Sequence, residues 1–300
     1  MYEDQSPVGE LVHLYVDGAF GRRELIERVV KMTGSLAAAM VALGGYQEMS
    51  AQATPVPPGV LVPENDPDIS GRDVTYAGLG GALYGYLVTP RRALAAQQPG
   101  VIVIHENRGL VEHHRDVARR AAKAGFVALA VDLLSRQGGT AQFADATAQA
   151  AAYNRTTQLD RRADLIASLD FLKRQEETTI HNRIGVVGFC AGGGNVWDLI
   201  VNVPEMAAAV PFYGAPPVEA DVAKIQTPVL GIYAETDRNL TRTMQATASV
   251  LSTQSKTYGL RVYQGVGHAF HNDTGAAYNA TAAMDAWGQT IAFFNQWLRR

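Results

Sequence analysis

One short stretch constrains the fold of this chain more than any other: the glycine-rich sequence Gly-Phe-Cys-Ala-Gly-Gly-Gly at residues 188–194. It directly follows the apolar run Ile184–Val187 and precedes a helical segment, so it predicts a tight strand–turn–helix with Cys190 at its tip. Gly188 and Gly192 are small enough to let the strand and the helix approach closely. The start of that helix places N–H groups and a positive dipole end beside the sulfur, which stabilises a thiolate. Cys190 is therefore a candidate nucleophile, and the alternative is a small buried cysteine packed beside the turn.

Short apolar runs alternate with longer amphipathic segments from residue 74 onward, which is typical of strands separated by helices. An antiparallel pair at the sheet edge is predicted at Val74–Ala77 and Ala82–Val88, joined through a glycine-rich turn. Buried parallel strands are predicted at Val101–His105, Val127–Val131, Ile184–Val187, Ala207–Phe212, Val229–Tyr233 and Leu260–Tyr263. Helices are predicted at Glu112–Ala124, Thr157–Gln175, Gly194–Asn202, Thr241–Thr253 and Ala276–Leu298. The pattern thus predicts an α/β fold with a mostly parallel central sheet flanked by helices.

The first 70 residues differ in composition from the rest of the chain. Apolar residues recur there at helical spacing, and residues 54–68 hold five prolines, which favours an extended strap. Helices of this kind need a surface to cover them, either on the rest of the chain or on a second copy in a homodimer. We therefore divide the chain into a helical N-terminal extension with a proline-rich linker at residues 1–70 and an α/β domain at residues 71–300.

Part of the extension resembles a twin-arginine export signal. Arg22 and Arg23, the apolar stretch 32–43 and the small residues Ala51-Gln52-Ala53 carry that resemblance. Charged residues directly after the arginines make the segment polar, so an ordinary amphipathic helix pair in a cytoplasmic protein is the preferred interpretation. Periplasmic export is the alternative. The apolar stretch is too short to span a membrane.

Charge and composition argue against several classes of function. The net charge is −3 and the basic residues are spread along the chain, so we expect no nucleic-acid partner. A single cysteine leaves neither an intramolecular disulfide nor a cysteine-rich zinc site. His113 and His114 are adjacent on a predicted helix and face different directions, which favours surface histidines over a metal pair. The glycines at 192–194 lack the lysine of a phosphate-binding loop. We expect no metal and no cofactor.

An acid and a histidine follow Cys190 in the chain order nucleophile, acid, histidine. Asp237 comes after the predicted strand Val229–Tyr233, at the end of the strand where such sheets carry their site residues. Glu235 is the competing carboxylate. His268 lies in the loop Gly-Val-Gly-His-Ala-Phe after the last predicted strand, where it can exchange protons with the nucleophile. An ordinary hydrogen-bonded loop histidine is the alternative for His268.

Gly-Phe-Cys-Ala-Gly-Gly, the aspartate after the later strand and Gly-His-Ala-Phe together resemble the dienelactone hydrolase family. The similarity covers about residues 72–298 and includes the stretches 101–106, 131–136 and 211–214. The resemblance implies an α/β-hydrolase fold in which Cys190, Asp237 and His268 match the family's catalytic residues.

The resemblance also implies roles for the loop after the third strand. The family has a glutamate there that contacts the resting cysteine, and Glu106 matches it. A carboxylate beside a thiol raises the pKa of the thiol unless a cation intervenes, so Glu106 is expected to keep Cys190 protonated until substrate displaces it. A surface salt bridge to Arg108 is the alternative. The family's oxyanion hole implies the backbone N–H groups of Asn107 and Ala191 as donors.

Two positions depart from the family pattern. The family's dienelactone enzymes bind the substrate carboxylate with two arginines. Those positions hold Asn272 and, by a looser alignment on Tyr153, Gln149. Without bidentate cationic partners, a dienelactone acid fits poorly, which favours a neutral ester. An apolar acyl pocket is expected from aromatic side chains, each with core packing as its alternative: Phe143, Tyr153, Phe212, Tyr213 and Phe270. Arg136 is a further candidate for substrate contact.

The sequence therefore predicts a hydrolase that cleaves small carboxylic esters or lactones through a Cys–His–Asp triad and an acyl-cysteine intermediate. Thioester or promiscuous phosphoester cleavage is the nearest alternative, because an activated nucleophile beside an oxyanion hole accepts several electrophiles. A non-catalytic binding protein on the same scaffold is the alternative from another class, since a fold alone does not entail activity.

Overall fold

The structure is a computed structural model that describes Leu11, residues 22–35, Ala38 and residues 61–91, 97–175 and 179–299. Helix α2 (Arg22–Thr33) begins at the twin arginines and confirms that part of the N-terminal extension is helical. The predicted cleavage site at 51–53 and residues 54–60 of the predicted strap lie outside the described residues.

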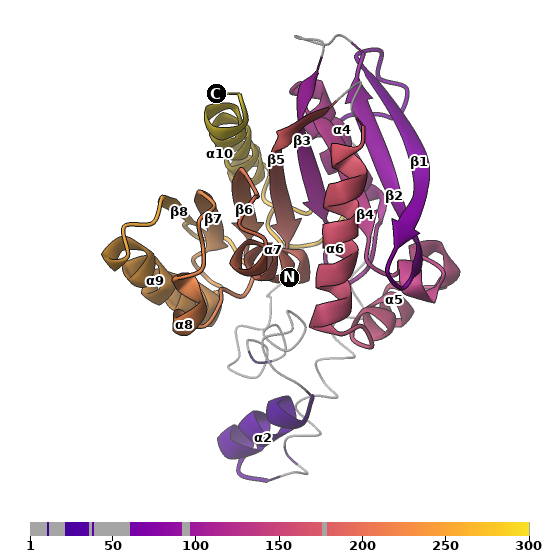
Figure 1. Ribbon diagram of the computed structural model, residues 1–300. Coiled ribbons are helices and arrows are strands. Elements are labelled where there is room, and N and C mark those ends of the chain that lie inside the picture. The colour runs from indigo at the N-terminus through magenta and orange to yellow at the C-terminus, as the bar shows by residue number, and fades with distance from the viewer. Residues whose placement is uncertain are drawn as a thin grey trace.

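Eight strands of the described residues form one sheet in the order β1-β2-β4-β3-β5-β6-β7-β8 (Figure 1). The first two pairings in this order are antiparallel and the other five are parallel. The strands are β1 (Ile69–Gly78), β2 (Gly81–Pro90), β3 (Gln98–Ile104), β4 (Val127–Asp132), β5 (Thr179–Phe189), β6 (Ala208–Phe212), β7 (Val229–Ala234) and β8 (Tyr258–Tyr263). Every predicted strand is confirmed, including the antiparallel pair at the edge.

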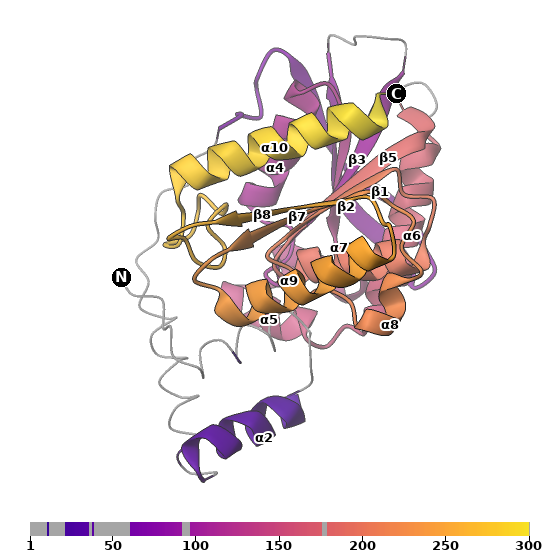
Figure 2. The same cartoon turned by 90° about the vertical axis from the view of Figure 1, so that its left-hand side faces the viewer.

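Helices cover both faces of the sheet. The first face carries α4 (Glu112–Lys123) and α10 (Ala280–Leu298), and the opposite face carries α6 (Gln158–Lys173), α7 (Ala191–Asn202) and α9 (Arg238–Thr253) (Figure 2). All five were predicted. Among the helices of the described residues, none has the length and apolar character needed to cross a membrane.

Four short helical segments were not predicted: α5 (Ala146–Tyr153), α8 (Glu219–Val222) and the 3-10 turns Ser135–Gln137 and Thr140–Gln142. Helix α5 lacks a clear apolar periodicity, but its start carries a signal: the Asp145 side chain accepts a hydrogen bond from the Ala148 N–H. Helix α7 begins at Ala191, earlier than the predicted Gly194, because the glycines there permit close packing rather than break the helix.

The hydrophobic core lies on both sides of the central strands. Every residue of β3, β4, β6 and β7 is buried, as expected for parallel strands covered on two faces. Strands β3, β5, β6, β7 and β8 run parallel, so the loops that follow them meet at one edge of the sheet. In open α/β sheets this is the edge where ligands bind.

Residues 61–68, the described part of the predicted linker, pack against the α/β domain. The side chain of Val62 is buried in the main hydrophobic core. The backbone N–H groups of Leu61 and Val62 donate to the Asp116 carboxylate of α4 at 3.1 and 2.9 Å. Lys123 forms an ion pair with Asp66 at 2.5 Å. This portion is therefore bound to α4 rather than free, and the domain boundary at residue 70 stays a prediction.

Candidate active site

Cys190 occupies the tight turn between β5 and α7. Its φ of 56° is positive, a conformation that a non-glycine residue adopts only at a cost and that clusters at functional sites. The Cys190 N–H donates to the Phe212 carbonyl at 3.1 Å, and the Cys190 carbonyl accepts from the Gly194 N–H at 3.1 Å. The turn is thus hydrogen-bonded to the end of β6 and to the first turn of α7, and the cysteine is buried.

Three glycines make this turn sterically possible. A Cβ at Gly188 would lie 2.3 Å from the Gly192 carbonyl oxygen, and one at Gly192 would lie 2.5 Å from the carbonyl oxygens of Ile104 and His105. A Cβ at Gly193 would lie 2.5 Å from the Phe212 carbonyl oxygen. The start of α7 therefore packs closely between the ends of β3 and β6. The predicted reason for the small residues flanking Cys190 is therefore confirmed.

His268 and Asp237 form a hydrogen-bonded pair. The His268 Nδ1 lies 2.6 Å from Asp237 Oδ2, and both side chains are buried. Asp237 directly precedes α9 after β7, and His268 follows β8. Glu235 is exposed and accepts instead from the Gly265 N–H at 2.8 Å. Asp237, rather than Glu235, is therefore the carboxylate that holds His268, through the Nδ1 of the ring.

The loop that carries His268 runs along the edge of the sheet at which the parallel strands end. At one end it is tied to Asp237 beside β7, and four residues later the Asn272 Nδ2 donates to Glu106 Oε2 at 2.8 Å, beside β3. Because β5 and β6 lie between β7 and β3, the loop passes the turn of Cys190. The ring of Tyr213, the residue after β6, lies with its centroid 4.9 Å from that of His268.

Strained backbone is concentrated at this edge. Four non-glycine residues in the described part of the chain have positive φ, and three of them are Cys190, Tyr213 and Ala269. Each follows a strand end or the candidate histidine. Such conformations persist only where the surrounding structure enforces them, which is typical of sites that must hold side chains in one geometry.

Glu106 is buried, so the alternative of a surface salt bridge to Arg108 is wrong. Its Oε2 accepts from Asn272, and its Oε1 is buried without a hydrogen-bond partner among the described residues. The Asn272 amide is neutral, so its bond to Glu106 brings no positive charge. Thr274 donates to the Asn272 Oδ1 from both its N–H, at 3.0 Å, and its hydroxyl, at 2.7 Å, which fixes the amide orientation.

The predicted oxyanion donors lie on two adjoining loops. Ala191 is the first residue of α7, and Asn107 follows β3 by three residues. Across the described residues, neither backbone N–H is used in a hydrogen bond. Contact between Gly192 and the His105 carbonyl brings the two loops together. The role of these two N–H groups as oxyanion donors stays a prediction.

The predicted substrate contacts divide into two groups. Tyr153 lies near the site, because its hydroxyl accepts from Asn195 Nδ2 at 2.8 Å on the helix that begins after Cys190. Tyr213 lies beside the His268 ring but is completely buried, so the structure favours core packing for it as well. Phe212 and Phe270 are completely buried and pack among other core rings, so the structure favours core packing, the alternative stated for them. The half-buried Phe143 packs at the edge of the same core.

Arg136 has a structural role in this chain. Its guanidinium donates to Asp164 through Nε and Nη2, both at 2.9 Å, and lies 2.8 Å from Asp160 through Nη1. Both carboxylates belong to α6, so the arginine ties this helix to the turn at Ser135–Gln137. Its charge is already neutralised within the protein, which leaves the predicted substrate contact without support.

The prediction that His113 and His114 lie on the surface is wrong, because both are buried in the core side of α4. His114 Nε2 accepts from the Glu106 N–H at 3.2 Å, and burial holds the pKa of His114 well below its ordinary value. His113 Nδ1 lies 2.6 Å from Asp273 Oδ1. Partners distant in sequence, which periodicity alone does not reveal, bury these polar rings.

Two further buried histidines flank the site. His105 accepts from the Leu133 N–H at 2.9 Å through Nε2 and bonds the Glu106 carbonyl through Nδ1, so it fixes the loop after β3. His271 lies against Phe189, with ring centroids 5.0 Å apart. Burial lowers the pKa of both rings. Within the described residues, no group of three or more His, Cys, Asp or Glu side chains is arranged to hold a metal ion.

Comparison with known proteins gives a family match over most of the chain. Residues 83–298 match the model of the dienelactone hydrolase family. A Saccharolobus solfataricus protein, to which carboxymethylenebutenolidase activity is ascribed, is 32% identical over 258 residues, covering 75% of this chain and 98% of that protein. Protein usf of Aquifex pyrophilus is 33% identical over 245 residues, covering 76% and 99%.

Solved structures agree with this match. A crystal structure ascribed to a dienelactone hydrolase of Klebsiella pneumoniae superposes with a TM-score of 0.69 at 27% identity, covering 76% of this chain and 99% of that one. A dienelactone hydrolase-like promiscuous phosphotriesterase from metagenomic libraries superposes with a TM-score of 0.67 at 26% identity, covering 77% and 99%. Residues 1–82 lie outside the family match.

Proposed function

The chain belongs to the dienelactone hydrolase family, and on that premise we propose that it cleaves carboxylic esters or lactones through a covalent acyl intermediate on Cys190. Membership of the family identifies it as a carboxylic ester hydrolase. The observation that carries the finer proposal is the His268–Asp237 hydrogen bond of 2.6 Å, in the loop that passes the strained turn of Cys190. That pairing orients a general base beside a nucleophile.

The proposed reaction proceeds in two steps. His268 Nε2 takes the thiol proton as the Cys190 sulfur attacks the carbonyl carbon, and the Asn107 and Ala191 N–H groups stabilise the oxyanion. His268 then returns the proton to the departing alkoxide, which leaves as an alcohol and creates a thioester on Cys190. In the second step His268 takes a proton from water, which attacks the thioester, and the released thiolate recovers that proton. Asp237 keeps His268 in one tautomer throughout.

A neutral acyl group is the substrate that the site favours. The positions at which the family's dienelactone enzymes carry arginines hold Asn272 and Gln149, and Asn272 is already bonded to Glu106 and Thr274. Neither side chain can neutralise a carboxylate on the substrate. Phosphotriester cleavage is a second candidate activity, because the dienelactone hydrolase-like promiscuous phosphotriesterase from metagenomic libraries shares the fold over 77% of this chain.

A substrate panel tests this proposal. We expect p-nitrophenyl esters of short neutral acids to be cleaved with a kcat/KM at least about tenfold above that of a matched ester that carries a free carboxylate. A neutral lactone, a thioester and a phosphotriester, measured beside them, rank the alternative electrophiles. A preference for the carboxylate-bearing ester would contradict the neutral-substrate proposal. A phosphotriester preferred over every acyl compound would make the second candidate the main activity.

We assign Glu106 to the control of the resting thiol. A buried carboxylate whose bonded side-chain partner, Asn272, is neutral disfavours a second negative charge close by, so we expect it to disfavour the Cys190 thiolate. Replacing Glu106 by glutamine keeps an acceptor for Asn272 but removes the charge. We expect Glu106→Gln to be alkylated by iodoacetamide at pH 6–7 about tenfold faster than the wild type and to oxidise more readily.

The matched control for this experiment is Glu235→Gln, which removes an exposed carboxylate from the loop after β7. Its alkylation rate is expected to equal that of the wild type. If Glu106→Gln is alkylated at the wild-type rate or more slowly, Glu106 has no such role.

A further inference from the structure

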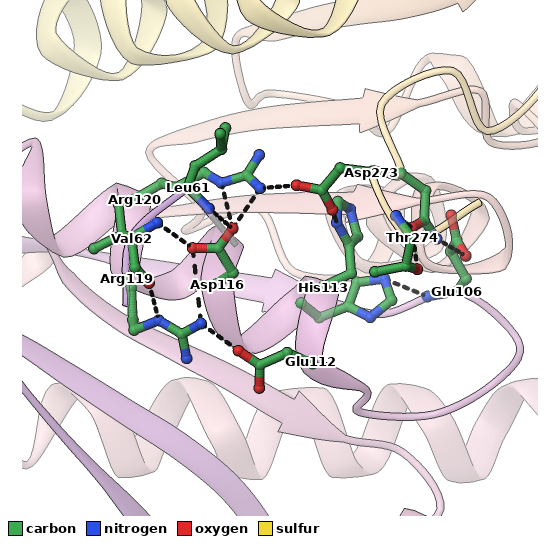
Figure 3. A network of polar contacts seen from close by, with 12 residues as sticks. Leu61, Val62, Glu106, Glu112, His113, Asp116, Arg119, Arg120, Asp273 and Thr274 are labelled. Atoms are coloured by element: carbon green, nitrogen blue, oxygen red, sulfur yellow. Dashed lines mark hydrogen bonds and ion pairs between the residues drawn. The ribbon is translucent and has the colours of Figure 1, made fainter. Parts of the chain in front are cut away.

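Asp273 joins the His268 loop to helix α4 through a buried polar network (Figure 3). Its Oδ1 lies 2.6 Å from His113 Nδ1, and its Oδ2 accepts a hydrogen bond from Arg120 Nη2. His113 and Arg120 both belong to α4, and all three side chains are buried. Burial opposes ionisation of Asp273, but the bonds from His113 and Arg120 hold its pKa below the usual value. Asp273 is therefore a carboxylate that its surroundings keep charged.

The same network continues to the segment that precedes the sheet (Figure 3). Arg120 also donates to Asp116 Oδ2, through Nε at 2.9 Å and through Nη2. Asp116, which is buried, accepts the backbone N–H groups of Leu61 and Val62. Arg119 reinforces this end by donating to the Val62 carbonyl. A continuous chain of bonds thus runs from residues 61–62 through α4 to the loop of the candidate active site.

The first turn of α4 contacts both loops that form the site. His113 holds Asp273 in the loop after β8, and the adjacent His114 accepts the Glu106 N–H in the loop after β3. The two histidines point to different partners because adjacent positions on a helix face different directions. One rigid helix therefore sets the spacing between the loop of His268 and the loop of Asn107.

We infer that Asp273 is a positioning residue that fixes the loop of His268, because Arg120 and His113 of α4 hold its carboxylate. Residues 61–62 support the other end of this network by binding Asp116, and we call the whole network the clamp. The inference rests on the proposed role of His268. Asn272 and Asp273 are neighbours, so a displaced Asp273 also loosens the bond from Asn272 to Glu106. A displacement of about 1 Å at a catalytic group can cost about 10²-fold in rate.

The test compares isosteric variants at the two ends of the network. Asp273→Asn removes the negative charge that Arg120 and His113 both contact. Asp116→Asn removes the negative charge at the other end of the network, beside residues 61–62. The matched control is Asp198→Asn, which weakens an ion pair to Arg162 between α7 and α6, away from the His268 loop. For each variant we measure kcat, KM, the pH profile of kcat/KM and the melting temperature, with the full chain and a neutral p-nitrophenyl ester.

We expect Asp273→Asn to lower kcat by about 10- to 100-fold with KM within about twofold of the wild type. The acid limb of kcat/KM should move to lower pH, because a loosened His268–Asp237 pair holds the imidazole proton less firmly. Asp116→Asn should lower kcat by about three- to tenfold. The double variant should resemble Asp273→Asn, because both changes act through one clamp and are not additive. A variant that only reduces the amount of folded enzyme should keep the acid limb of kcat/KM at the wild-type pH.

The inference is wrong if folded Asp273→Asn matches Asp198→Asn in kcat and in its acid limb. Where Asp273→Asn fails to fold, Asp116→Asn decides in the same way against the same control. A Cys190→Ala protein with normal turnover would instead remove the proposed triad. That outcome would contradict the proposed function and not the positioning role of Asp273, because it is measured in a chain whose Asp273 network is intact.

Discussion

Replacing Cys190 by alanine is expected to lower kcat for a neutral ester by at least about 10⁴-fold, because it removes the atom that forms the covalent intermediate. Little change in the melting temperature is expected. The side chain is small, and its N–H and carbonyl bonds to Phe212 and Gly194 come from the backbone, which alanine keeps. The measurement is steady-state turnover of a p-nitrophenyl ester beside thermal unfolding of the same preparation.

Cys190→Ser serves as the companion to that variant. A hydroxyl depends on the base more than a thiol does, so the serine protein should keep part of the activity and should resist iodoacetamide. Wild-type turnover in the alanine protein would end the proposal that Cys190 is the nucleophile.

Asp237→Asn is expected to lower kcat by about 10³- to 10⁴-fold. Asp237 accepts from His268 Nδ1 at 2.6 Å and so selects the tautomer in which Nε2 can take a proton. An asparagine amide that presents its NH₂ group to Nδ1 favours the opposite tautomer, with the proton on Nε2. The change preserves the shape of a buried side chain, so the loss should fall on kcat rather than on folding.

Glu235→Gln is the control for that experiment. Glu235 lies two residues before Asp237, is exposed, and accepts hydrogen bonds from the Gly265 N–H and from the Gln264 side-chain amide rather than from His268. Its variant should keep kcat within about twofold of the wild type. An inactive Glu235→Gln beside an active Asp237→Asn would reverse the assignment of the acid.

The sequence predicted those parts of the molecule that depend on local pattern. Apolar runs marked the central strands such as β3 and β7, because parallel strands that are buried on both faces carry few polar residues. The turn of Cys190 was equally readable, since only glycine at 188 and 192 avoids collision with neighbouring backbone. Chain order placed Asp237 and His268 after neighbouring strands, which lie side by side in any sheet of this topology.

Contacts between distant segments were not predictable in the same way. Arg120 and Asp273 are separated by 153 positions, and Asp116 bonds backbone groups more than 50 positions earlier. Nothing in the local spacing of His113 and His114 distinguishes a buried polar pair from a surface pair. Burial of such groups depends on partners supplied by the tertiary fold, which satisfy their hydrogen bonds.

The proposed acyl intermediate on Cys190 is tested most directly by the mass of the enzyme during turnover. The wild type is mixed with a p-nitrophenyl ester of a slowly hydrolysed neutral acid, quenched in acid within the first turnovers, and analysed intact and after proteolysis. We expect one acyl group for each chain, on the peptide that contains Cys190, and none in Cys190→Ala. An acyl group on any other residue, or turnover without a modified Cys190 peptide, would contradict the proposed intermediate.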